Sequence, residues 1–568
     1  MRGFRRATRR LALSVVLGPG ALAAPAVGGV PPAAAAAPCV PGQAPGEVVW
    51  SVPAAVNSTL RGPAVFGDDG ATYVAVVTAE GIAALDCTGV ERWSFDFAGR
   101  LGPAMDFQQA HHPMVVGDDG TLYVGTLAFE GESPGAVVAL TADGKLRWVY
   151  RGKVDAVQFA GALGLDAAGR PAVGAGSFSD VTGGTTNDGQ LMVLDAFGRP
   201  LPGFPVTTNP LSIAPATLAD GRLVFLANRG PGGAALPSPT RTATPPPSAT
   251  ATATARATST PTPTDTPAAT GTMPPSPAPR PALAHLPWVW RSGNGREPGD
   301  MLRRGGGDRA SGGSRRRLAA GAGSAQAADD EPTPTPAVLQ SASTVVYVVD
   351  PAQPPGMAFA IDGLVGKPPV AVGDVAIFEV LRNDVRRLVA LDLGAMPPRE
   401  LWSYALLDRT AGAPLVGQVD SATGRAELIF VDLAGILTAL DVPIRSSAGG
   451  QPRFRWARRV SDPGTGSPVL GDAGVIYIAT RNGVAAFEQD DGAPLWAVDL
   501  APARPISSLA LSPGGLLMVW CASIQPNPLL PPNPPMLFAI ATESRGLDPD
   551  AAWPVERRDG RNSGRAGR

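Results

Sequence analysis

Residues 113–150 read PMVVGDDGTLYVGTLAFEGESPGAVVALTADGKLRWVY. The stretch contains four short apolar runs, rich in β-branched and aromatic residues, with Asp-Gly or similar turn residues between them. Apolar runs of this length between tight turns predict an antiparallel meander of four strands. We therefore interpret the cassette as one four-stranded sheet.

The same cassette recurs along the chain. Clear copies span residues 63–93 and 467–496, and weaker copies end at residues 203–206, at Trp402 and at Trp456. An Ala or Val near the end of the third run stands at positions 84, 139 and 193, and again at 390, 439, 486 and 539. Four strands repeated about every 50 residues predict an all-β fold, a β-propeller of four-stranded blades.

The spacing of these positions predicts eight blades, with seven as the alternative if the copy around residues 359–362 is degenerate. Residues 46–52, GEVVWSV, resemble the fourth strands at 91–96 and 400–405 but precede the first full cassette. We expect this strand to be the outer strand of the last blade. That pairing would close the ring and leave no blade unpaired.

The turns between third and fourth strands resemble a known family. Residues 486–496, AFEQDDGAPLW, resemble the Ala-x-Asp-x-x-x-Gly-x-x-x-Trp docking motif of pyrroloquinoline-quinone-type (quinoprotein-like) propeller repeats, and residues 84–93 and 139–148 match it one residue short. The resemblance implies that the Trp of one blade packs against the next blade, and it is specific for fold and not for activity. The matching positions are Trp93, Trp148, Trp402, Trp456 and Trp496.

The composition changes between the two groups of cassettes. Residues 236–280 are almost entirely Pro, Thr, Ala and Ser, and residues 291–317 hold eight Arg against three acids. Such segments cannot bury enough apolar surface to offset the ordering of the chain, so a disordered spacer is expected. An O-glycosylated stalk, or a contact of the Arg cluster with anionic wall polymer or membrane, is the alternative.

The expected organisation has five parts. They are a signal peptide (1–37), the ring-closing strand and blades 1 to 4 (38–229), the Pro/Thr/Ala-rich and Arg/Gly-rich insert (230–341), the second part of the propeller (342–545) and a basic C-terminal tail (546–568). The insert interrupts blade 4 between its second and third strands. By strand alternation it leaves from the face of second-to-third strand connections, where we hypothesise that it modulates ligand access.

The N-terminus indicates export. The first ten residues hold five Arg and no acid, and an uncharged apolar stretch with an Ala tract at 33–37 follows, as in a secretory signal peptide. A retained membrane helix is the weaker alternative, and residues 8–13 partly resemble a twin-arginine signal. We expect an exported protein that is periplasmic, extracellular or at the cell surface.

The overall composition excludes several classes of protein. Gly and Pro make up about 23% of the chain, about twice their average usage, which excludes a mostly helical protein. A net charge of -2 over 568 residues gives no argument for nucleic acid. No second apolar run of spanning length follows the leader, so we expect no transmembrane span after cleavage. We also expect the protein to be a monomer.

The three cysteines, Cys39, Cys87 and Cys521, have no metal-ligand or CxxC spacing. Pro38 directly precedes Cys39, which disfavours a lipid anchor. Cys39 lies just before the ring-closing strand and Cys87 lies in a third-to-fourth strand turn of the first blade. Both therefore fall on one face of neighbouring blades, and a disulfide between them is expected.

Few side chains suggest catalysis. His111 and His112 lie in a connection between blades, and adjacent residues of an extended segment point apart, so they cannot readily share one metal. The pairs Asp68-Asp69, Asp118-Asp119 and Asp490-Asp491 invite a calcium site, but each precedes Gly and fits a hairpin turn better. The chain has no GxSxG, HExxH, P-loop or EF-hand pattern.

Three functions remain open at this point. The first is a non-catalytic scaffold, without cofactor, that binds a protein, a glycan or another envelope component. The second is a quinoprotein dehydrogenase with pyrroloquinoline quinone and calcium in the ring centre; relatives of that kind carry adjacent cysteines, which this chain lacks. The third is an outer-membrane assembly-type scaffold, which fits the eight-blade size.

Overall fold

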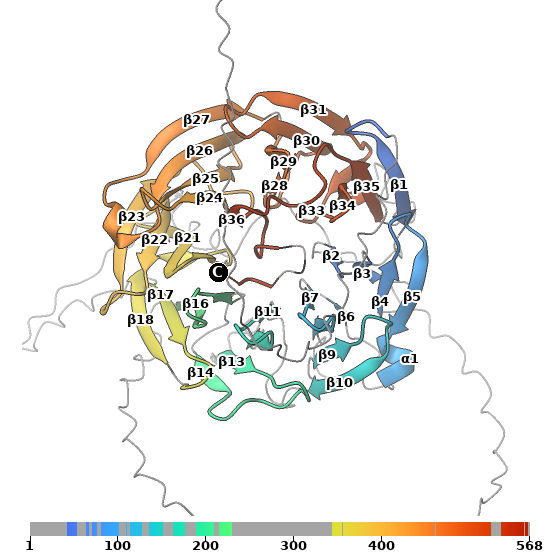
Figure 1. Ribbon diagram of the computed structural model, residues 1–568, viewed down its shortest axis with the longest axis horizontal. Helices are drawn as coiled ribbons and strands as arrows, with labels where there is room; N and C mark the ends of the chain where they lie inside the picture. Colours follow the sequence, from blue (N-terminus) through green and yellow to red (C-terminus); the bar gives the residue numbers. More distant parts are fainter. Residues whose placement is uncertain are drawn as a thin grey trace, which may run out of the picture. The chain divides into compact units, whose positions relative to one another are not determined.

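The structure is a computed structural model of the chain. It describes residues 43–53, 64–67, 71–76, 81–101, 109–110, 114–127, 136–151, 163–175, 189–208, 215–229, 343–354, 356–460, 462–523, 535–559, 561 and 563–565. Within these ranges the strands form eight antiparallel sheets arranged as blades around a central axis (Figure 1). The fold is therefore a β-propeller of eight blades, and the alternative of seven is wrong.

Each blade is a meander that starts at the axis and ends at the rim. Blade 1 consists of β2 (Val65–Phe66), β3 (Thr72–Val76), β4 (Gly81–Leu85) and β5 (Glu91–Asp96), and blade 2 consists of β6 (Gln109–Ala110), β7 (Val115–Val116), β8 (Leu122–Leu127), β9 (Ala136–Leu140) and β10 (Leu146–Arg151). Blade 3 consists of β11 (Leu163–Leu165), β12 (Pro171–Ala175), β13 (Gly189–Val193) and β14 (Val206–Thr208), and blade 4 consists of β15 (Ala216–Thr217), β16 (Leu223–Arg229), β17 (Ser343–Val349) and β18 (Met357–Asp362).

Blades 5 to 8 follow the same plan. Blade 5 consists of β19 (Leu364–Val365), β20 (Val370–Val372), β21 (Val375–Arg382), β22 (Val385–Asp392) and β23 (Arg399–Ala405), and blade 6 consists of β24 (Leu415–Asp420), β25 (Arg425–Val431), β26 (Ile436–Pro443), β27 (Arg453–Arg459) and β36 (Ala551–Trp553). Blade 7 consists of β28 (Val469–Gly471), β29 (Val475–Ala479), β30 (Gly483–Glu488) and β31 (Pro494–Asp499), and blade 8 consists of β32 (Ala503–Pro505), β33 (Ala510–Leu511), β34 (Leu516–Ser523), β35 (Met536–Ala541) and β1 (Val48–Pro53). The short helices are α1 (Phe97–Leu101) and the 3-10 turn η4 (Ser446–Ala448).

The core lies between neighbouring blades. The third strand of blade 2, β9, is buried along its whole length, whereas its outer neighbour β10 is partly exposed. Ala84 of blade 1 and Val138 of blade 2 share one apolar cluster, and similar clusters join other neighbouring blades. Because both faces of a blade are covered in this way, its inner strands are continuous apolar runs.

Two long-range pairings complete the ring. β1 pairs with β35, with Trp50 opposite Ala539, so the strand before the first cassette is the outer strand of blade 8. β16 pairs with β17 along seven residues, with Leu223 opposite Val349, although residues 230–342 separate them in the chain. The sheet of blade 4 is therefore continuous across the insert. Residues 230–342 themselves lie outside the described ranges.

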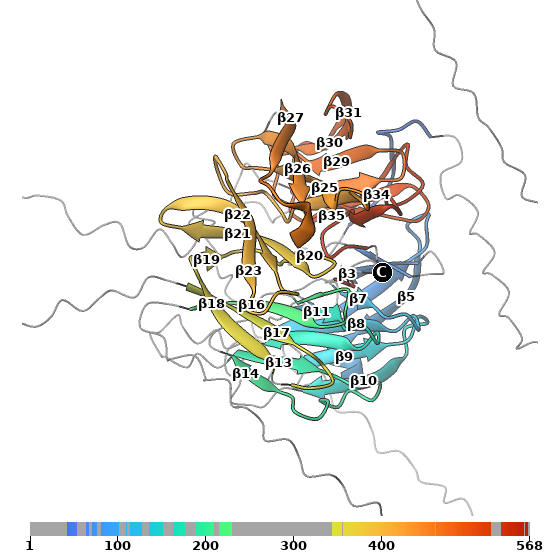
Figure 2. The same ribbon diagram turned by 60° about the vertical axis from the view of Figure 1, so that its left-hand side comes forward.

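The ring has two faces, which differ in the connections they carry. Because strand direction alternates, first-to-second and third-to-fourth strand turns share one face, here called the turn face. Second-to-third strand connections and connections between blades share the other, here called the crossover face, where β16 ends and β17 begins. Figure 2 shows the same strands with the molecule turned by 60°. Neither short helix in the described ranges has the length and hydropathy that a bilayer span requires.

The C-terminal segment differs from its expected role as a separate tail. The sequence places the end of the propeller at residue 545, whereas β36 joins blade 6 as an extra innermost strand and lies inside the ring (Figure 1). The reason is physical: Trp553 is fully buried there, and the inner edge of β24 offers unpaired backbone groups to a further strand.

Candidate functional site: the centre of the ring

The C-terminal segment enters the ring on the side of blades 6 and 7. β36 runs antiparallel to β24, with Trp553 opposite Val416. Beyond it, the amide of Leu470 in blade 7 donates to the carbonyl of Pro554 over 2.7 Å. This first leg is therefore held by strand pairing and apolar burial.

The chain then reverses direction at two arginines. Arg557 and Arg558 have φ angles of 63° and 76°, a left-handed region that non-glycine residues rarely adopt. The amide of Gly564 donates to the Arg557 carbonyl over 2.8 Å, which closes the loop. The segment therefore forms a compact U inside the ring.

Arg557 anchors the bend of this U. Its side chain is almost fully buried, and its Nη1 and Nη2 atoms donate to the carbonyls of Pro215 (2.5 Å) and Leu163 (2.6 Å). Burial lowers the pKa of Arg557 to about 10, although the charges of Glu556 and Asp559 act in the opposite direction. The guanidinium thus remains a buried cation at neutral pH, bound by carbonyl oxygens at the starts of blades 3 and 4.

The second leg of the U passes blades 2, 3 and 4 in succession. Amides of three innermost strands donate to carbonyls of the segment: Val116 to Arg561 (3.0 Å), Leu165 to Ser563 (2.9 Å) and Thr217 to Gly564 (2.7 Å). The segment therefore satisfies backbone groups that innermost strands would otherwise leave unpaired.

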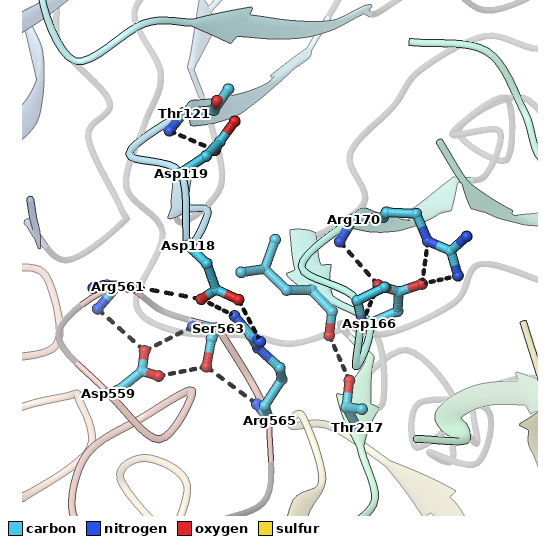
Figure 3. A network of polar contacts seen from close by, with 12 residues as sticks. Asp118, Asp119, Thr121, Asp166, Arg170, Thr217, Asp559, Arg561, Ser563 and Arg565 are labelled. Carbon is cyan, nitrogen blue, oxygen red and sulfur yellow. Dashed lines mark hydrogen bonds and ion pairs between the residues drawn. The ribbon is translucent and has the colours of Figure 1, made fainter. Parts of the chain in front are cut away.

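A polar network fixes this leg to blade 2 (Figure 3). Asp118, in the turn between β7 and β8, accepts hydrogen bonds from Arg561 (3.3 Å) and from both terminal nitrogens of Arg565 (2.6 and 3.0 Å). The hydrogen bond from Arg565 holds the pKa of Asp118 below its usual value; partial burial acts against this, and the charges of Arg565 and Arg561 add to it. Asp118 is therefore an ion-pair partner of the segment as well as a turn residue.

Two further carboxylates order the segment. Asp559 accepts from the amides of Arg561 (3.1 Å) and Ser563 (2.9 Å) and from the Ser563 hydroxyl (2.5 Å). Glu556 accepts from the hydroxyls of Ser467, over 3.1 Å, and of Ser508. These serines precede the innermost strands of blades 7 and 8, so the segment contacts both sides of the ring.

A cavity of about 660 Å³ opens above this segment on the turn face. Its walls are turns of blades 1 to 4 and 8, and its charged lining consists of Asp118, Asp559, Arg558, Arg561 and Arg565. A second cavity of about 680 Å³, toward blades 5 and 6, is lined by Asp374, Asp392, Arg445 and again Arg558. Arg558 is therefore common to both cavities.

The described residues at the ring centre do not fit a calcium ion. Calcium takes six to eight oxygen ligands, mostly from carboxylates and carbonyls. Asp118 and Asp559 instead accept hydrogen bonds from arginine, serine and backbone N–H groups. In the described ranges no three or more His, Cys, Asp or Glu side chains come together in a group that could hold a metal. We therefore derive no chemistry through a quinone and calcium at this place.

The five tryptophans singled out in the sequence lie at the rim. Three indole N–H groups donate to carbonyls of the next blade: Trp93 to Ala142 (2.9 Å), Trp402 to Pro443 (2.7 Å) and Trp456 to Gln489 (3.1 Å). The indole of Trp496 donates to the carboxylate of Glu543 in blade 8. Each of these tryptophans therefore links its own blade to the next one.

Glycines in the same turns receive the indole rings. A Cβ atom at Gly144 would lie 2.5 Å from the ring of Trp93, and one at Gly198 would lie 2.6 Å from the ring of Trp148. Trp50 makes the same contact across the seam of the ring, because its N–H donates to the carbonyl of Cys87 over 2.9 Å. Trp50 is a rim position outside the five that match the sequence motif.

The remaining sequence candidates are described only in part. His111, His112 and the pair Asp68-Asp69 lie outside the described ranges. Asp118-Asp119 and Asp490-Asp491 occupy hairpin turns. Among those of these candidates that the structure describes, Asp118 is the one that lines the central cavity.

The cysteines are described in part. Cys87 is disulfide-bonded, and Cys521 is a buried free thiol whose pKa burial raises to about 12. Cys39 lies outside the described ranges, so its pairing with Cys87 stays a prediction.

Sequence reasoning missed the arginines of the C-terminal segment. The sequence alone indicates only a basic end of the chain, which contains Arg557, Arg558, Arg561 and Arg565. The available signal was Trp553 followed by alternating charges, which predicts an anchor but not the blades to which it binds.

Comparisons with known proteins agree with the propeller fold. Residues 42–203 match the family model described as outer membrane protein assembly factor BamB, a model of PQQ-type repeats. This match confirms the resemblance to that repeat family for the part of the chain from β1 to β13. No curated protein sequence matches the chain significantly.

Many solved structures also match, at low identity. The C-terminal WD40 domain of Sif2 is 8% identical over 87% of this chain and 98% of its own, with a TM-score of 0.43. A catalytically inactive virginiamycin B lyase from Staphylococcus aureus is 8% identical over 86% and 98%, with a TM-score of 0.35. A protein of unknown function from Bacteroides caccae is 12% identical over 29% of this chain, which spans only 51% of that protein, with a TM-score of 0.21.

Proposed function

We propose that this chain is an exported, non-catalytic β-propeller that serves as a scaffold in the cell envelope and binds a protein or glycan on its turn face. The family model that matches residues 42–203 carries the description of an outer membrane protein assembly factor, which supports an envelope role. The arginine-rich, apolar N-terminus supports export.

The observation that carries the proposal is the distribution of exposed apolar side chains. Of the ten exposed large hydrophobic residues in the described ranges, six lie in a third-to-fourth strand turn or within the first two residues of the strand after it, and a seventh, Val48, begins the closing strand β1. These seven are Val48, Val90, Leu146, Phe197, Met396, Phe454 and Leu495. All belong to the turn face, one in each of seven blades, and we expect the partner to bind on that face.

The C-terminal segment in the ring centre supports the non-catalytic part of the proposal. The chain's own C-terminal segment lies where the quinone-type relatives hold their cofactor, and it brings four arginines to that place. Such a segment stiffens the ring and leaves the faces for recognition. The ring would then act as a rigid platform.

Photo-crosslinking from the two faces tests the docking surface. A photoreactive residue at Phe197 or Met396, each 73% exposed on the turn face, should crosslink to one defined envelope component in the cells that make the protein. The matched control positions are Leu407, 87% exposed, and Val385, 40% exposed, on the crossover face. Crosslinks of equal yield from both faces, or from the control face alone, would contradict the proposal.

A cofactor titration tests the absence of catalysis. The purified mature chain is titrated with pyrroloquinoline quinone and Ca²⁺, and its tryptophan fluorescence is followed. We expect no saturable change. One-to-one binding would overturn the non-catalytic assignment and would justify a screen of alcohol and sugar substrates.

A further inference from the structure

Arg558 is bound differently from the other arginines of the C-terminal segment. Arg557 donates to two carbonyls, and Arg561 and Arg565 donate to Asp118. Within the described ranges the Arg558 guanidinium makes no hydrogen bond, and its one ion pair, with Asp559, measures 3.6 Å. Its Nε atom is buried without a partner. A charged donor group in this state is costly unless an acceptor reaches it.

The backbone of Arg558 is also held in an unfavourable conformation. Its φ of 76° lies in the left-handed region, which costs a non-glycine residue free energy and marks positions where surrounding structure fixes a side chain for a purpose. The amide of Arg558 donates to the Val555 carbonyl over 2.8 Å, and the buried Arg557 anchors the preceding residue. The backbone of Arg558 is thus fixed, and its side chain lines both cavities.

Acidic side chains line both cavities that Arg558 lines, Asp118 and Asp559 in the first and Asp374, Asp392 and Asp550 in the second, but among the described residues Asp559 alone forms an ion pair with it, over 3.6 Å. The turn-face cavity is lined by three arginines and two aspartates, and both aspartates already accept several hydrogen bonds, Asp118 from arginines and Asp559 from Ser563 and amides. Arg557 adds a buried cation next in the chain. In the second cavity, burial and the charges of Asp220 and Asp392 raise the pKa of Asp374, which disfavours its negative form.

We propose that Arg558 is the principal ligand of an anion-binding site in the turn-face cavity, which accepts a carboxylate or phosphoryl group. The planar guanidinium matches either group with two parallel hydrogen bonds. The cavity of about 660 Å³ has room for the anion together with part of the molecule that bears it. The site goes beyond the scaffold role, because a small free anion would occupy it without any protein or glycan partner.

Calorimetric titration of the full mature chain tests the site with three probes: inorganic phosphate, sulfate and succinate, each in chloride buffer of matched ionic strength. We expect at least one probe to bind saturably with one site per chain. If phosphate binds more strongly than succinate, the site accepts a phosphoryl group; if succinate binds more strongly, it accepts a carboxylate.

Substitutions at Arg558 assign the binding to this residue. Arg558→Gln should weaken the bound probe about tenfold or more, the loss expected for a charge-assisted hydrogen bond. Arg558→Lys keeps the charge but lacks the planar guanidinium, so its affinity for the probe should lie between those of the unsubstituted chain and the Gln variant. This variant remains informative if the Gln variant unfolds. The matched control is Arg453→Gln, an exposed arginine on the outer strand β27. No saturable binding by the unsubstituted chain, or equal binding by the Gln variant, would overturn the proposal.

Discussion

The blades of this ring are joined by different contacts at the rim and at the axis. At the rim, the same contact is repeated from blade to blade: an indole from one fourth strand donates to the next blade and covers a glycine in its turn. At the axis, one segment contacts blades on both sides of the ring through unrelated interactions, namely a strand, a buried cation and an ion pair. The rim therefore joins neighbours only, whereas the axis joins blades that are distant in the chain.

This difference assigns separate roles to the two regions. Loss of one rim contact weakens one interface between blades, because each blade contacts only its neighbours. Loss of the axial segment weakens several blades at once. The axis should therefore control the cooperativity of the ring, and the rim should control its local stability.

Truncation of the axial segment should have the largest effect. A chain that ends at residue 545 loses β36 and the fully buried Trp553. Burial of a tryptophan is worth about 3–5 kcal/mol, and the exposed inner edges add to the loss. We expect a clearly lower melting temperature and a broadened transition by scanning calorimetry.

The control for this truncation is a chain that ends at residue 565, which keeps all the contacts described above. A truncation at 545 that melts as sharply and at the same temperature as this control would show that the axis does not couple the blades.

Substitution of rim tryptophans comes next in size and should depend on burial. Trp402 is 1% exposed and donates to Pro443, so Trp402→Ala should cost about 3–5 kcal/mol in denaturant unfolding. Trp93 is only half-buried, so Trp93→Ala should cost about 1–2 kcal/mol. Equal losses would mean that the hydrogen bond, and not burial, governs the rim.

These rim contacts could be expected from the sequence, and the reason is local. Strand alternation, turn residues between the strands and a Trp near the start of most fourth strands repeat about every 50 residues, and each repeat contacts only its neighbours. The same logic predicts the eight blades, the closing strand and the interruption of blade 4, which the pairings show.

The axis could not be expected from the sequence. Asp118 and Arg565 are 447 residues apart in the chain, and no periodicity links them. Asp118 has the spacing of an ordinary turn residue, which it also is. The three residues of β36, AAW, are too few to show the alternation of a strand. Contacts that occur once, between distant segments, leave no repeated pattern.

Within the axis, two adjacent arginines should behave in opposite ways. Arg557→Met leaves the carbonyls of Pro215 and Leu163 without their donor, so we expect a loss of about 1–3 kcal/mol in denaturant unfolding. Arg558→Gln removes no hydrogen bond of the described chain and should leave the free energy of unfolding nearly unchanged. The reverse order would contradict the distinction between an anchoring and a ligand-binding arginine.

The smallest expected effect separates an ion pair of the axis from one of the rim. Asp118→Asn removes the acceptor of Arg561 and Arg565; because Asp118 is 58% exposed, the loss at neutral pH should be about 0.5 kcal/mol. Since the folded chain lowers the pKa of Asp118, this contribution is fully present above the ordinary value of 3.8 and is lost as the pH falls through the lowered pKa. The difference between Asp118→Asn and the unsubstituted chain should therefore shrink in acid, and also in 1 M salt. Asp143→Asn is the matched rim variant, because Asp143 pairs with Lys145 inside one exposed turn and holds no distant segments together. If chemical denaturation at several pH values gave the rim variant the larger loss, the axial ion pair would add nothing to the closure of the ring.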